Sequence, residues 1–227
     1  MELKVIAYAR NGHSDKFGIP RQSREESPIV TRIVFEPDYR VAEALRGIEG
    51  YSHLWLIWGF SEITNDQSPM TNDTWSPTVR PPRLGGNTRM GVFATRSPFR
   101  PNPLGLSSVR LLGIEGGNLV VSGADLMDGT PIYDIKPYLS FSDSHPDARN
   151  GFAEESKGYR LSVIGDGLRD VPDEIRRDIC YILSQDPRPA YQNDPTREYK
   201  MDYAGLRVVF TVDEARVYVK KIEKIAK

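Results

Sequence analysis

Short apolar segments separated by polar turns dominate the first part of the chain. Residues 3–9 and 29–35 are rich in β-branched and aromatic side chains, and residues 53–60 are almost continuously apolar. We therefore expect two strands followed by a buried central strand, with a short helix over residues 41–45. Further strand-like segments cover residues 90–95, 107–114, 118–123 and 132–135. Many short strands with Gly and Pro turns and almost no helix predict an antiparallel β-barrel or sandwich.

The pattern changes after residue 138. Residues 142–158 are polar, and a second unit follows in which we expect one helix and three strands. The helix covers residues 172–183, and the strands cover residues 159–164, 206–212 and 215–222. We therefore predict a mainly β protein with two domains: an antiparallel β-barrel over residues 1–145, and a small α+β C-terminal domain over residues 146–227.

A long segment rich in proline and glycine, residues 61–88, interrupts the strands. Its second part begins a stretch of positive charge, because no acidic residue and no lysine occurs between Asp73 and Glu115. The same stretch contains six arginines: Arg80, Arg83, Arg89, Arg96, Arg100 and Arg110. The guanidinium fork suits phosphate and carboxylate and stacks on bases, so an anionic or aromatic ligand is expected. Arginines that are solvated or paired within the protein would explain the composition equally well.

Composition excludes several classes of protein. The single cysteine, Cys180, allows no internal disulfide, and the chain has only three histidines, far apart in sequence, so we expect no metal site. No apolar run approaches the ~20 residues of a membrane helix. Without a secretory segment, a cytoplasmic location is expected.

Gly165-Asp166-Gly167 resembles the start of a dinucleotide fold, but Asp170 occupies the third glycine position, so a tight turn is predicted.

Two rigid loops carry the candidate chemistry. Residues 95–105 form a cationic, proline-rich loop, and residues 125–138 form an anionic one that contains Asp128-Gly129. Proline fixes the backbone of such loops, and Asp-Gly is a turn former. Together they predict a crevice for a ligand that has both a carboxylate and a cationic centre.

Several longer motifs resemble those of the tRNA threonylcarbamoyladenosine N6-methyltransferase family, the TrmO-like β-barrel proteins. They occur in the same order over most of residues 1–138 and again near residues 185–207, whereas residues 61–75 and 140–180 match weakly. The motifs are Pro20-Arg21-Gln22, Gly50-Tyr51-Ser52-His53-Leu54-Trp55, Arg80-Pro81-Pro82-Arg83-Leu84-Gly85-Gly86-Asn87, Arg89-Met90-Gly91-Val92-Phe93-Ala94-Thr95-Arg96-Ser97, Arg100-Pro101-Asn102-Pro103-Leu104-Gly105, Asp128-Gly129-Thr130-Pro131 and Gln185-Asp186-Pro187-Arg188-Pro189-Ala190-Tyr191.

The resemblance implies an S-adenosylmethionine-dependent methyltransferase that acts on tRNA. Its substrate is expected to be an adenosine beside the anticodon that already carries a threonylcarbamoyl group on N6. It implies a homodimer with the cofactor near the subunit interface, and no membrane or DNA partner is expected.

The resemblance also implies the site residues by motif position. Cofactor contacts are expected from Pro20, Arg21, Gln22, Ser61, Glu62, Arg96, Leu106, Ala124, Asp125 and Leu126. Phosphate contacts to RNA are expected from Arg80, Arg83, Arg89 and Arg100, and base stacking from Tyr138 and Tyr191. Asp125 or Asp128 is expected to face the sulfonium or the ribose, and no catalytic residue is identified.

Three other classes of function are compatible with parts of the pattern. A β-barrel that binds RNA or S-adenosylmethionine without methylating would show no methyl incorporation into tRNA. A small-molecule methyltransferase would be active without tRNA. A purely structural module would not need the arginine stretch that lacks acidic residues or the loops fixed by proline, so these features argue against it.

Overall fold

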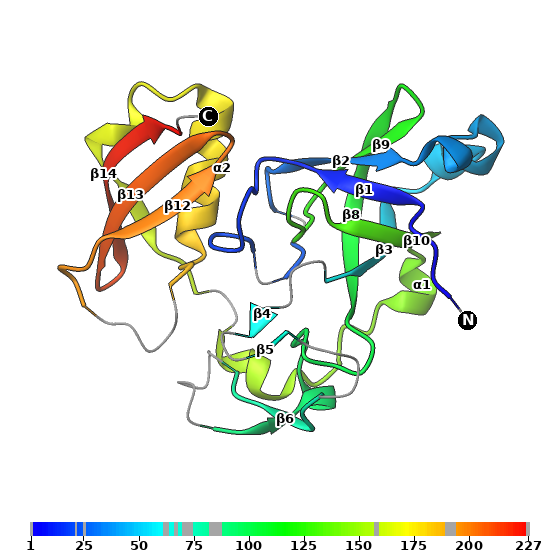
Figure 1. Ribbon diagram of the computed structural model, residues 1–227, viewed down its shortest axis with the longest axis horizontal. Helices are drawn as coiled ribbons and strands as arrows, with labels where there is room; N and C mark the ends of the chain where they lie inside the picture. The colour runs from blue at the N-terminus through cyan, green and yellow to red at the C-terminus, as the bar shows by residue number, and fades with distance from the viewer. Residues whose placement is uncertain are drawn as a thin grey trace.

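The computed structural model describes residues 2–20, 22–24, 26–60, 64–65, 68–69, 75–81, 88–156, 159–188 and 194–225. Six antiparallel strands close into a barrel in the order β1-β10-β3-β8-β9-β2 (Figure 1). The barrel strands are β1 Ala7–Arg10, β2 Val30–Phe35, β3 His53–Gly59, β8 Leu104–Glu115, β9 Asn118–Ser122 and β10 Pro131–Pro137. The mainly β fold class with a barrel is therefore confirmed.

Alternation of side chains explains how strand β3 serves both the barrel interior and the surface. Leu54, Leu56 and Trp58 are buried in the barrel cluster, while Trp55 and Ile57 between them are half-buried on the other face. Successive side chains of a strand point to opposite faces. One face of β3 therefore packs in the barrel core, and Trp55 and Ile57 give its other face apolar side chains as well.

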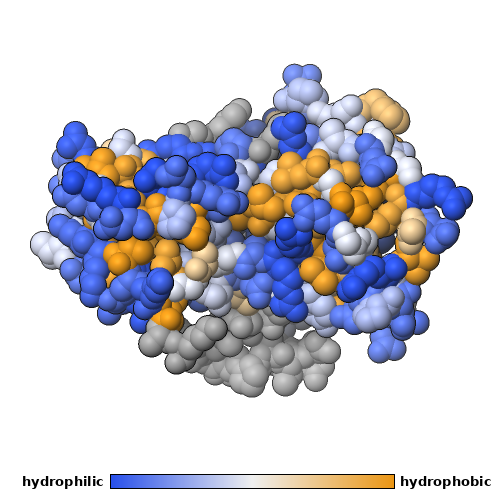
Figure 2. Space-filling model, turned by 90° about the horizontal axis from the view of Figure 1, so that it is seen from above, coloured by the Kyte–Doolittle hydropathy of each residue, from blue (hydrophilic) through white to orange (hydrophobic). Residues whose placement is uncertain are grey.

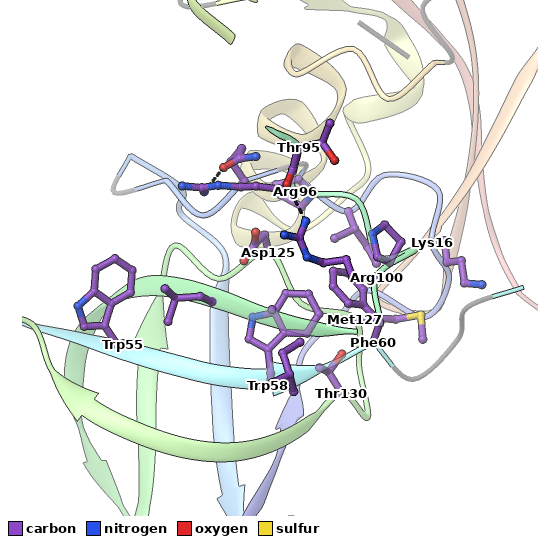
Figure 3. A pocket seen from close by; sticks show the side chains of 17 residues that line it. Lys16, Trp55, Trp58, Phe60, Thr95, Arg96, Arg100, Asp125, Met127 and Thr130 are labelled. Carbon is purple, nitrogen blue, oxygen red and sulfur yellow. Dashed lines mark hydrogen bonds between the residues drawn. The ribbon is translucent and has the colours of Figure 1, made fainter. Parts of the chain in front are cut away.

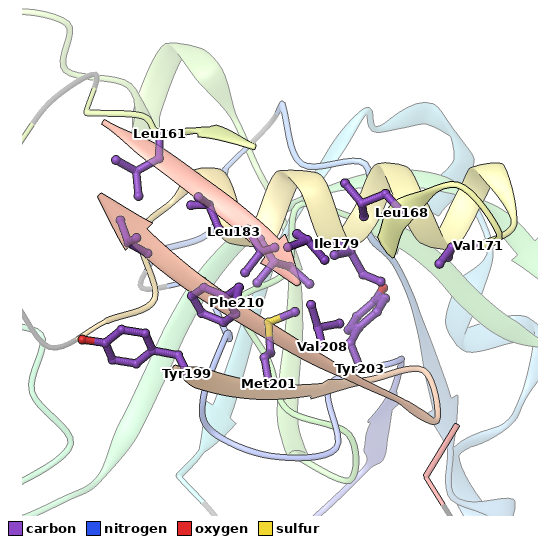
Figure 4. Packing of buried hydrophobic residues seen from close by; sticks show 14 of the residues in the cluster. Leu161, Leu168, Val171, Ile179, Leu183, Tyr199, Met201, Tyr203, Val208 and Phe210 are labelled. Atoms are coloured by element: carbon purple, nitrogen blue, oxygen red, sulfur yellow. The ribbon is translucent and has the colours of Figure 1, made fainter. Parts of the chain in front are cut away.

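The C-terminal unit is a four-stranded sheet in the order β11-β14-β13-β12, covered by one helix. Helix α2, Asp173–Ser184, packs its buried face, which includes Ile179 and Leu183, against the sheet (Figure 4). The strands are β11 Ser162–Ile164, β12 Tyr199–Tyr203, β13 Leu206–Asp213 and β14 Arg216–Lys224. Cys180 is half-buried on α2 and packs against this cluster.

Short elements occupy the connections between the strands of both units. They are α1 Ser140–Asp143, the short strands β4 Thr64–Asn65, β5 Ser68–Pro69, β6 Thr78–Val79 and β7 Met90–Gly91, and the 3-10 turns η1 Pro37–Tyr39, η2 Ala42–Leu45, η3 Ile48–Gly50, η5 Val92–Ala94, η6 Gly151–Ser156 and η7 Asp166–Leu168. None of the described helices is both long and apolar enough to cross a membrane. Figure 2 shows hydrophilic side chains interspersed with apolar patches on the face seen from above Figure 1.

Several predicted elements differ from the observed ones. The strand expected over residues 90–95 was wrong beyond β7, because η5 follows directly. The helix expected over residues 41–45 is the 3-10 turn η2. Strand β12 was not predicted at all, although its burial alternates along Tyr199–Tyr203. The turn predicted at Gly165 is present, since η7 begins at the next residue.

The two hydrophobic clusters are separate but share one N-terminal segment. The barrel cluster is drawn from residues up to Ile135, whereas the C-terminal cluster contains Ile29 together with residues beyond 160. Phe17 also packs on the C-terminal cluster, with its ring centroid 6.3 Å from that of Phe210. The division at residue 145 stays a prediction, and the segment before β2 belongs to the packing of both units.

Candidate functional site

A pocket of about 520 Å³ opens beside strands β3 and β8 (Figure 3). This volume lies within the range of sites that hold small molecules, roughly 300–1,000 Å³. One wall is apolar and aromatic, and it includes Trp55, Trp58, Phe60 and Leu106. Polar groups come from three loops that are distant in sequence: Lys16 and Gln22, Arg96 and Arg100, and Asp125 and Thr130. The pocket therefore combines aromatic faces with both signs of charge.

Asp125 is held in the pocket by a chain of hydrogen bonds. The indole Nε1 of Trp58 donates to Ser107 Oγ at 2.9 Å, and Ser107 Oγ contacts Asp125 Oδ1. Because an indole N–H only donates, the Ser107 oxygen accepts from Trp58 and its own proton goes to the Asp125 carboxylate. Burial raises the pKa of Asp125, against the lowering effect of the Ser107 hydroxyl, the backbone of Ser23 and the charge of Arg96.

A glycine on the neighbouring strand makes room for the Trp58 indole. Gly105 on β8 is the cross-strand partner of Trp58 on β3. A Cβ at residue 105 would lie 2.1 Å from Cε2 of that indole, closer than atoms can pack. The glycine therefore lets the indole lie across β8, where its N–H reaches Ser107.

The two pocket arginines have different partners. Arg96 is exposed and donates to Oε1 of Gln22. Arg100 instead donates through Nη1 to the carbonyl oxygens of Val92 at 3.0 Å and Thr95 at 2.8 Å. Arg100 thus fixes the loop that follows β7, and Arg96 presents its guanidinium at the pocket.

The loop between β1 and β2 is fixed from both units. Asn11 Nδ2 donates to Leu126 O at 2.9 Å, which ties this loop to the one that carries Asp125. On the other side, Ala204 N donates to Gly12 O at 2.9 Å. Gly18 has φ +100°, and a Cβ there would lie 2.6 Å from Sδ of Met201 in the C-terminal cluster. The C-terminal unit therefore backs the wall of the pocket that contains Lys16.

His13 lies at this junction between the units. It is 2% exposed, and its ring centroid is 5.1 Å from that of Tyr203 in an edge-on arrangement. Burial lowers its pKa to about 4, so it is neutral at pH 7. The residue is part of the packing rather than a charged member of the site.

Comparison with known proteins gives two family matches that cover most of the chain. The tRNA-methyltransferase O N-terminal domain matches residues 8–144, and the TrmO C-terminal domain matches residues 165–225. The chain belongs to the TrmO family.

Individual relatives agree with this result. The tRNA (adenine(37)-N6)-methyltransferase of Escherichia coli is 38% identical over 203 residues, which cover 84% of this chain and 83% of the relative. A Pseudomonas aeruginosa protein with the provisional name S-adenosylmethionine-dependent methyltransferase RcsF is 42% identical over 209 residues, 87% of this chain and 86% of that protein. A crystal structure of TrmO from Pseudomonas aeruginosa has a TM-score of 0.77 at 31% identity, and the match covers 98% of both chains.

The structure brings half of the ten cofactor residues implied by the TrmO motifs to the pocket. They are Pro20, Gln22, Arg96, Leu106 and Asp125. The side chains of Ala124 and Leu126 are instead 1% exposed in the barrel cluster, so only Asp125 of that tripeptide turns to the pocket. Arg21, Ser61 and Glu62 lie outside the described residues.

The structure gives different roles to the two carboxylates between which the sequence does not decide. Asp125 lines the pocket. Asp128 accepts a hydrogen bond from the backbone N–H of Asn11 at 3.1 Å and pairs with Arg10 at 3.4 Å. Asp128 therefore fixes the loop between β1 and β2, and Asp125 remains as the carboxylate at the site.

Two of the residues expected to contact RNA lie at the pocket: Arg100 lines it, and Tyr138 lies against the lining residue Trp55. Arg80 and Arg89 are exposed beside β6 and β7, and Arg89 donates to Thr78 Oγ1 at 3.0 Å. Tyr138 is half-buried, with its ring centroid 5.4 Å from that of Trp55. Arg83 and Tyr191 lie outside the described residues.

Sequence reasoning missed the aromatic wall and part of the polar lining. Trp55 and Trp58 belong to a segment expected as a buried strand, although the period of a strand places them on opposite faces. Thr130 lies inside a recognised motif, but the motif does not show its place in the lining. Lys16 and Met127 line the pocket from loops without a pattern that marks them.

Proposed function

We propose that this chain transfers a methyl group from S-adenosylmethionine to N6 of the adenine at position 37 of tRNA, on a nucleoside that already carries a threonylcarbamoyl group. The observation that supports this most directly is the pocket itself, in which a half-buried carboxylate, Asp125, and an exposed guanidinium, Arg96, flank aromatic side chains. This chemistry fits a nucleoside with a charged amino-acid tail. The family membership and the methyltransferase relatives agree with it.

The residues present fit the cofactor group by group. The guanidinium of Arg96 offers a fork suited to a carboxylate. The Asp125 carboxylate accepts hydrogen bonds from donor groups of the nucleoside, and the paired rings of Trp58 and Phe60, 4.4 Å apart, give an apolar surface for flat or aliphatic parts. When bound, S-adenosylmethionine supplies an electrophilic methyl group on a sulfonium.

Methyl transfer is an in-line displacement, so the pocket must orient the acceptor nitrogen and exclude water. The carbonyl of the threonylcarbamoyl group withdraws electron density from N6 and makes its proton more acidic than in plain adenosine. The work of the described residues is therefore to bind, to orient and to keep the site dry.

We further propose that the active form is a cytoplasmic homodimer, with neither DNA nor membrane as a partner. The outward face of β8 supports the dimer. Leu104, Leu106 and Leu112 are separated by even numbers of residues, so they share one face of this strand, and they are 38%, 56% and 50% exposed. The first two also line the pocket, so a subunit covering this face would lie next to the cofactor.

The test of the function is methyl transfer with purified chain, labelled S-adenosylmethionine and two versions of one tRNA. The modified tRNA carries threonylcarbamoyladenosine, and the matched transcript does not. We expect N6-methylated threonylcarbamoyladenosine by nucleoside mass spectrometry from the modified tRNA and little methylation of the transcript. Activity without any tRNA would indicate a small-molecule methyltransferase, and no incorporation into either RNA would contradict the proposal.

Cofactor affinity should depend on Arg96 and not on Arg110. Both lie in the arginine-rich stretch, but Arg96 lines the pocket, whereas Arg110, which is exposed on β8, is not among the residues that line it. Loss of a charge-assisted hydrogen bond is worth about 1.5–3 kcal/mol, which is roughly a 10- to 150-fold change in affinity. We expect this weakening for Arg96→Ala and an unchanged affinity for Arg110→Ala, measured by calorimetry with S-adenosylmethionine. Equal affinities in the two variants would contradict the assignment.

A further inference from the structure

Two aromatic rings next to the pocket, those of Trp75 and Phe93, are exposed to solvent. Phe93 on η5 is 71% exposed and Trp75 is 41% exposed. Their ring centroids are 5.9 Å apart with an angle of 34° between the planes. Large apolar rings grouped on a surface generally mark an interaction site.

The exposure of Phe93 is imposed by a rigid turn and does not come from a loose segment. Val92 is 1% exposed, and its backbone N–H donates to Pro77 O at 2.9 Å. Arg100 holds the same turn through its bonds to Val92 O and Thr95 O. The guanidinium carbon of Arg100 also lies 5.5 Å from the centroid of the Phe93 ring. The ring is therefore presented outward by a turn that is anchored on both sides.

This position adjoins the pocket, because Arg100 belongs to both. Its side chain packs on Phe93 and lines the pocket. Thr95, which follows η5 directly, lines the pocket too. A flat group placed on the aromatic pair would thus lie at the pocket entrance.

The surrounding charge indicates which kind of partner would cover these rings. Arg80 and Arg89 are exposed on the neighbouring β6 and β7 segments, and no ion pair is seen for either among the described residues. No acidic residue occurs in the sequence between Asp73 and Glu115. Aromatic faces among exposed arginines match single-stranded nucleic acid, in which bases stack on rings and phosphates pair with cations.

We propose that Trp75 and Phe93 form a stacking platform for an unpaired base of the tRNA at the entrance of the pocket. Arg100 is a positioning residue that fixes Phe93 there. The proposal rests on the proposed function, since it names how that RNA substrate is held. An enzyme that modifies a base must take this base, and often its neighbours, out of the stack, and the platform would stabilise the unstacked arrangement.

The test compares Phe93→Ala and Trp75→Ala with Phe141→Ala. Phe141 is a matched control because it is 88% exposed on α1 and takes no part in the platform. Stacking on one aromatic side chain changes nucleic-acid affinity by about 5- to 150-fold on removal. We expect the Kd of modified tRNA to rise by about tenfold or more in both platform variants and to stay unchanged in Phe141→Ala. Phe93→Trp should restore it.

Two further measurements distinguish a base platform from a cofactor contact and from a subunit interface. The Kd of S-adenosylhomocysteine should stay within about twofold of the unsubstituted protein, and a loss here would mean that the rings belong to the cofactor pocket. The sedimentation coefficient should not change, and dissociation of a dimer in Phe93→Ala would mean that a second copy covers the rings. Unchanged tRNA affinity in both variants overturns the proposal outright. Methyl transfer by the unsubstituted protein is assayed in parallel, so that failure of the proposed function is seen separately from failure of the platform.

Discussion

Replacing Gly105 by alanine is expected to destabilise the protein and to weaken cofactor binding together. The added Cβ would lie 2.1 Å from Cε2 of the Trp58 indole and 2.3 Å from its Cζ2, so the ring has to move off β8. Overpacking of this kind costs about 1–3 kcal/mol. Moving the indole also breaks its hydrogen bond to Ser107 Oγ, and the hydroxyl that donates to the Asp125 carboxylate is then no longer held by Trp58.

The matched control for this prediction is Gly113→Ala. Gly113 lies on the same strand β8, and nothing lies within 4 Å of a Cβ built there. We expect the urea midpoint and the Kd of S-adenosylhomocysteine to change in Gly105→Ala and neither to change by a comparable amount in Gly113→Ala. A Gly105→Ala protein with the stability and affinity of the unsubstituted chain would show that the indole has another place to go.

The barrel was predictable because its signal is local. Runs of apolar and β-branched residues at β2, β3 and β9 are bounded by Gly and Pro, and each strand was expected within a few residues of where it lies. Strand β12 was missed although it carries a local signal as well. Its sequence, Tyr199–Tyr203, places Lys and Asp between the buried residues, which is the alternation of a half-buried strand, and it pairs with β13.

The sequence predicted fewer of the site residues than of the strands. Its polar groups come from loops around residues 16, 96 and 125. The sequence predicted that the loops around residues 96 and 125 flank one crevice, but it contains no signal that the loop around residue 16 joins them. The resemblance to the TrmO family supplied Asp125, but it also included Ala124 and Leu126. The side chains of Ala124 and Leu126 point into the barrel core, whereas that of Asp125 between them lines the pocket. A sequence motif does not show in which direction each of its side chains points.

The residues that hold the site were invisible for a related reason. Ser107 is an ordinary strand residue in sequence, and Asn11 lies in a loop without a recognised motif. Their roles come from single hydrogen bonds to Asp125 and to Leu126 O, across sequence separations that no local pattern spans. Positions of this kind are found only when the fold brings the partners together.

Replacing Ser107 by alanine is expected to move the acid limit of cofactor binding to higher pH. Burial raises the pKa of Asp125, and the Ser107 hydroxyl is the largest of the effects that lower it again. The ionised carboxylate is the form that accepts hydrogen bonds, so affinity is present above the pKa of Asp125 and is lost as the pH falls through it. Removing the Ser107 donor raises this pKa further, and the loss of affinity therefore begins at a higher pH.

The measurement is the Kd of S-adenosylhomocysteine as a function of pH for Ser107→Ala, with two comparisons. Ser108→Ala is the matched control, because Ser108 is the next residue on β8 and is not part of the hydrogen-bond chain. Asp125→Asn removes the titrating group, so this variant should bind S-adenosylhomocysteine weakly and its affinity should no longer fall at low pH.

The other charged groups around the pocket do not produce the same result. Lys16, Arg96 and Arg100 line it from the neighbouring loops, and Asp125 is the one carboxylate among the described lining residues. A Ser107→Ala protein whose acid limb coincides with that of the unsubstituted chain would show that Asp125 does not titrate in cofactor binding, and the assignment of its carboxylate to the cofactor would then be wrong.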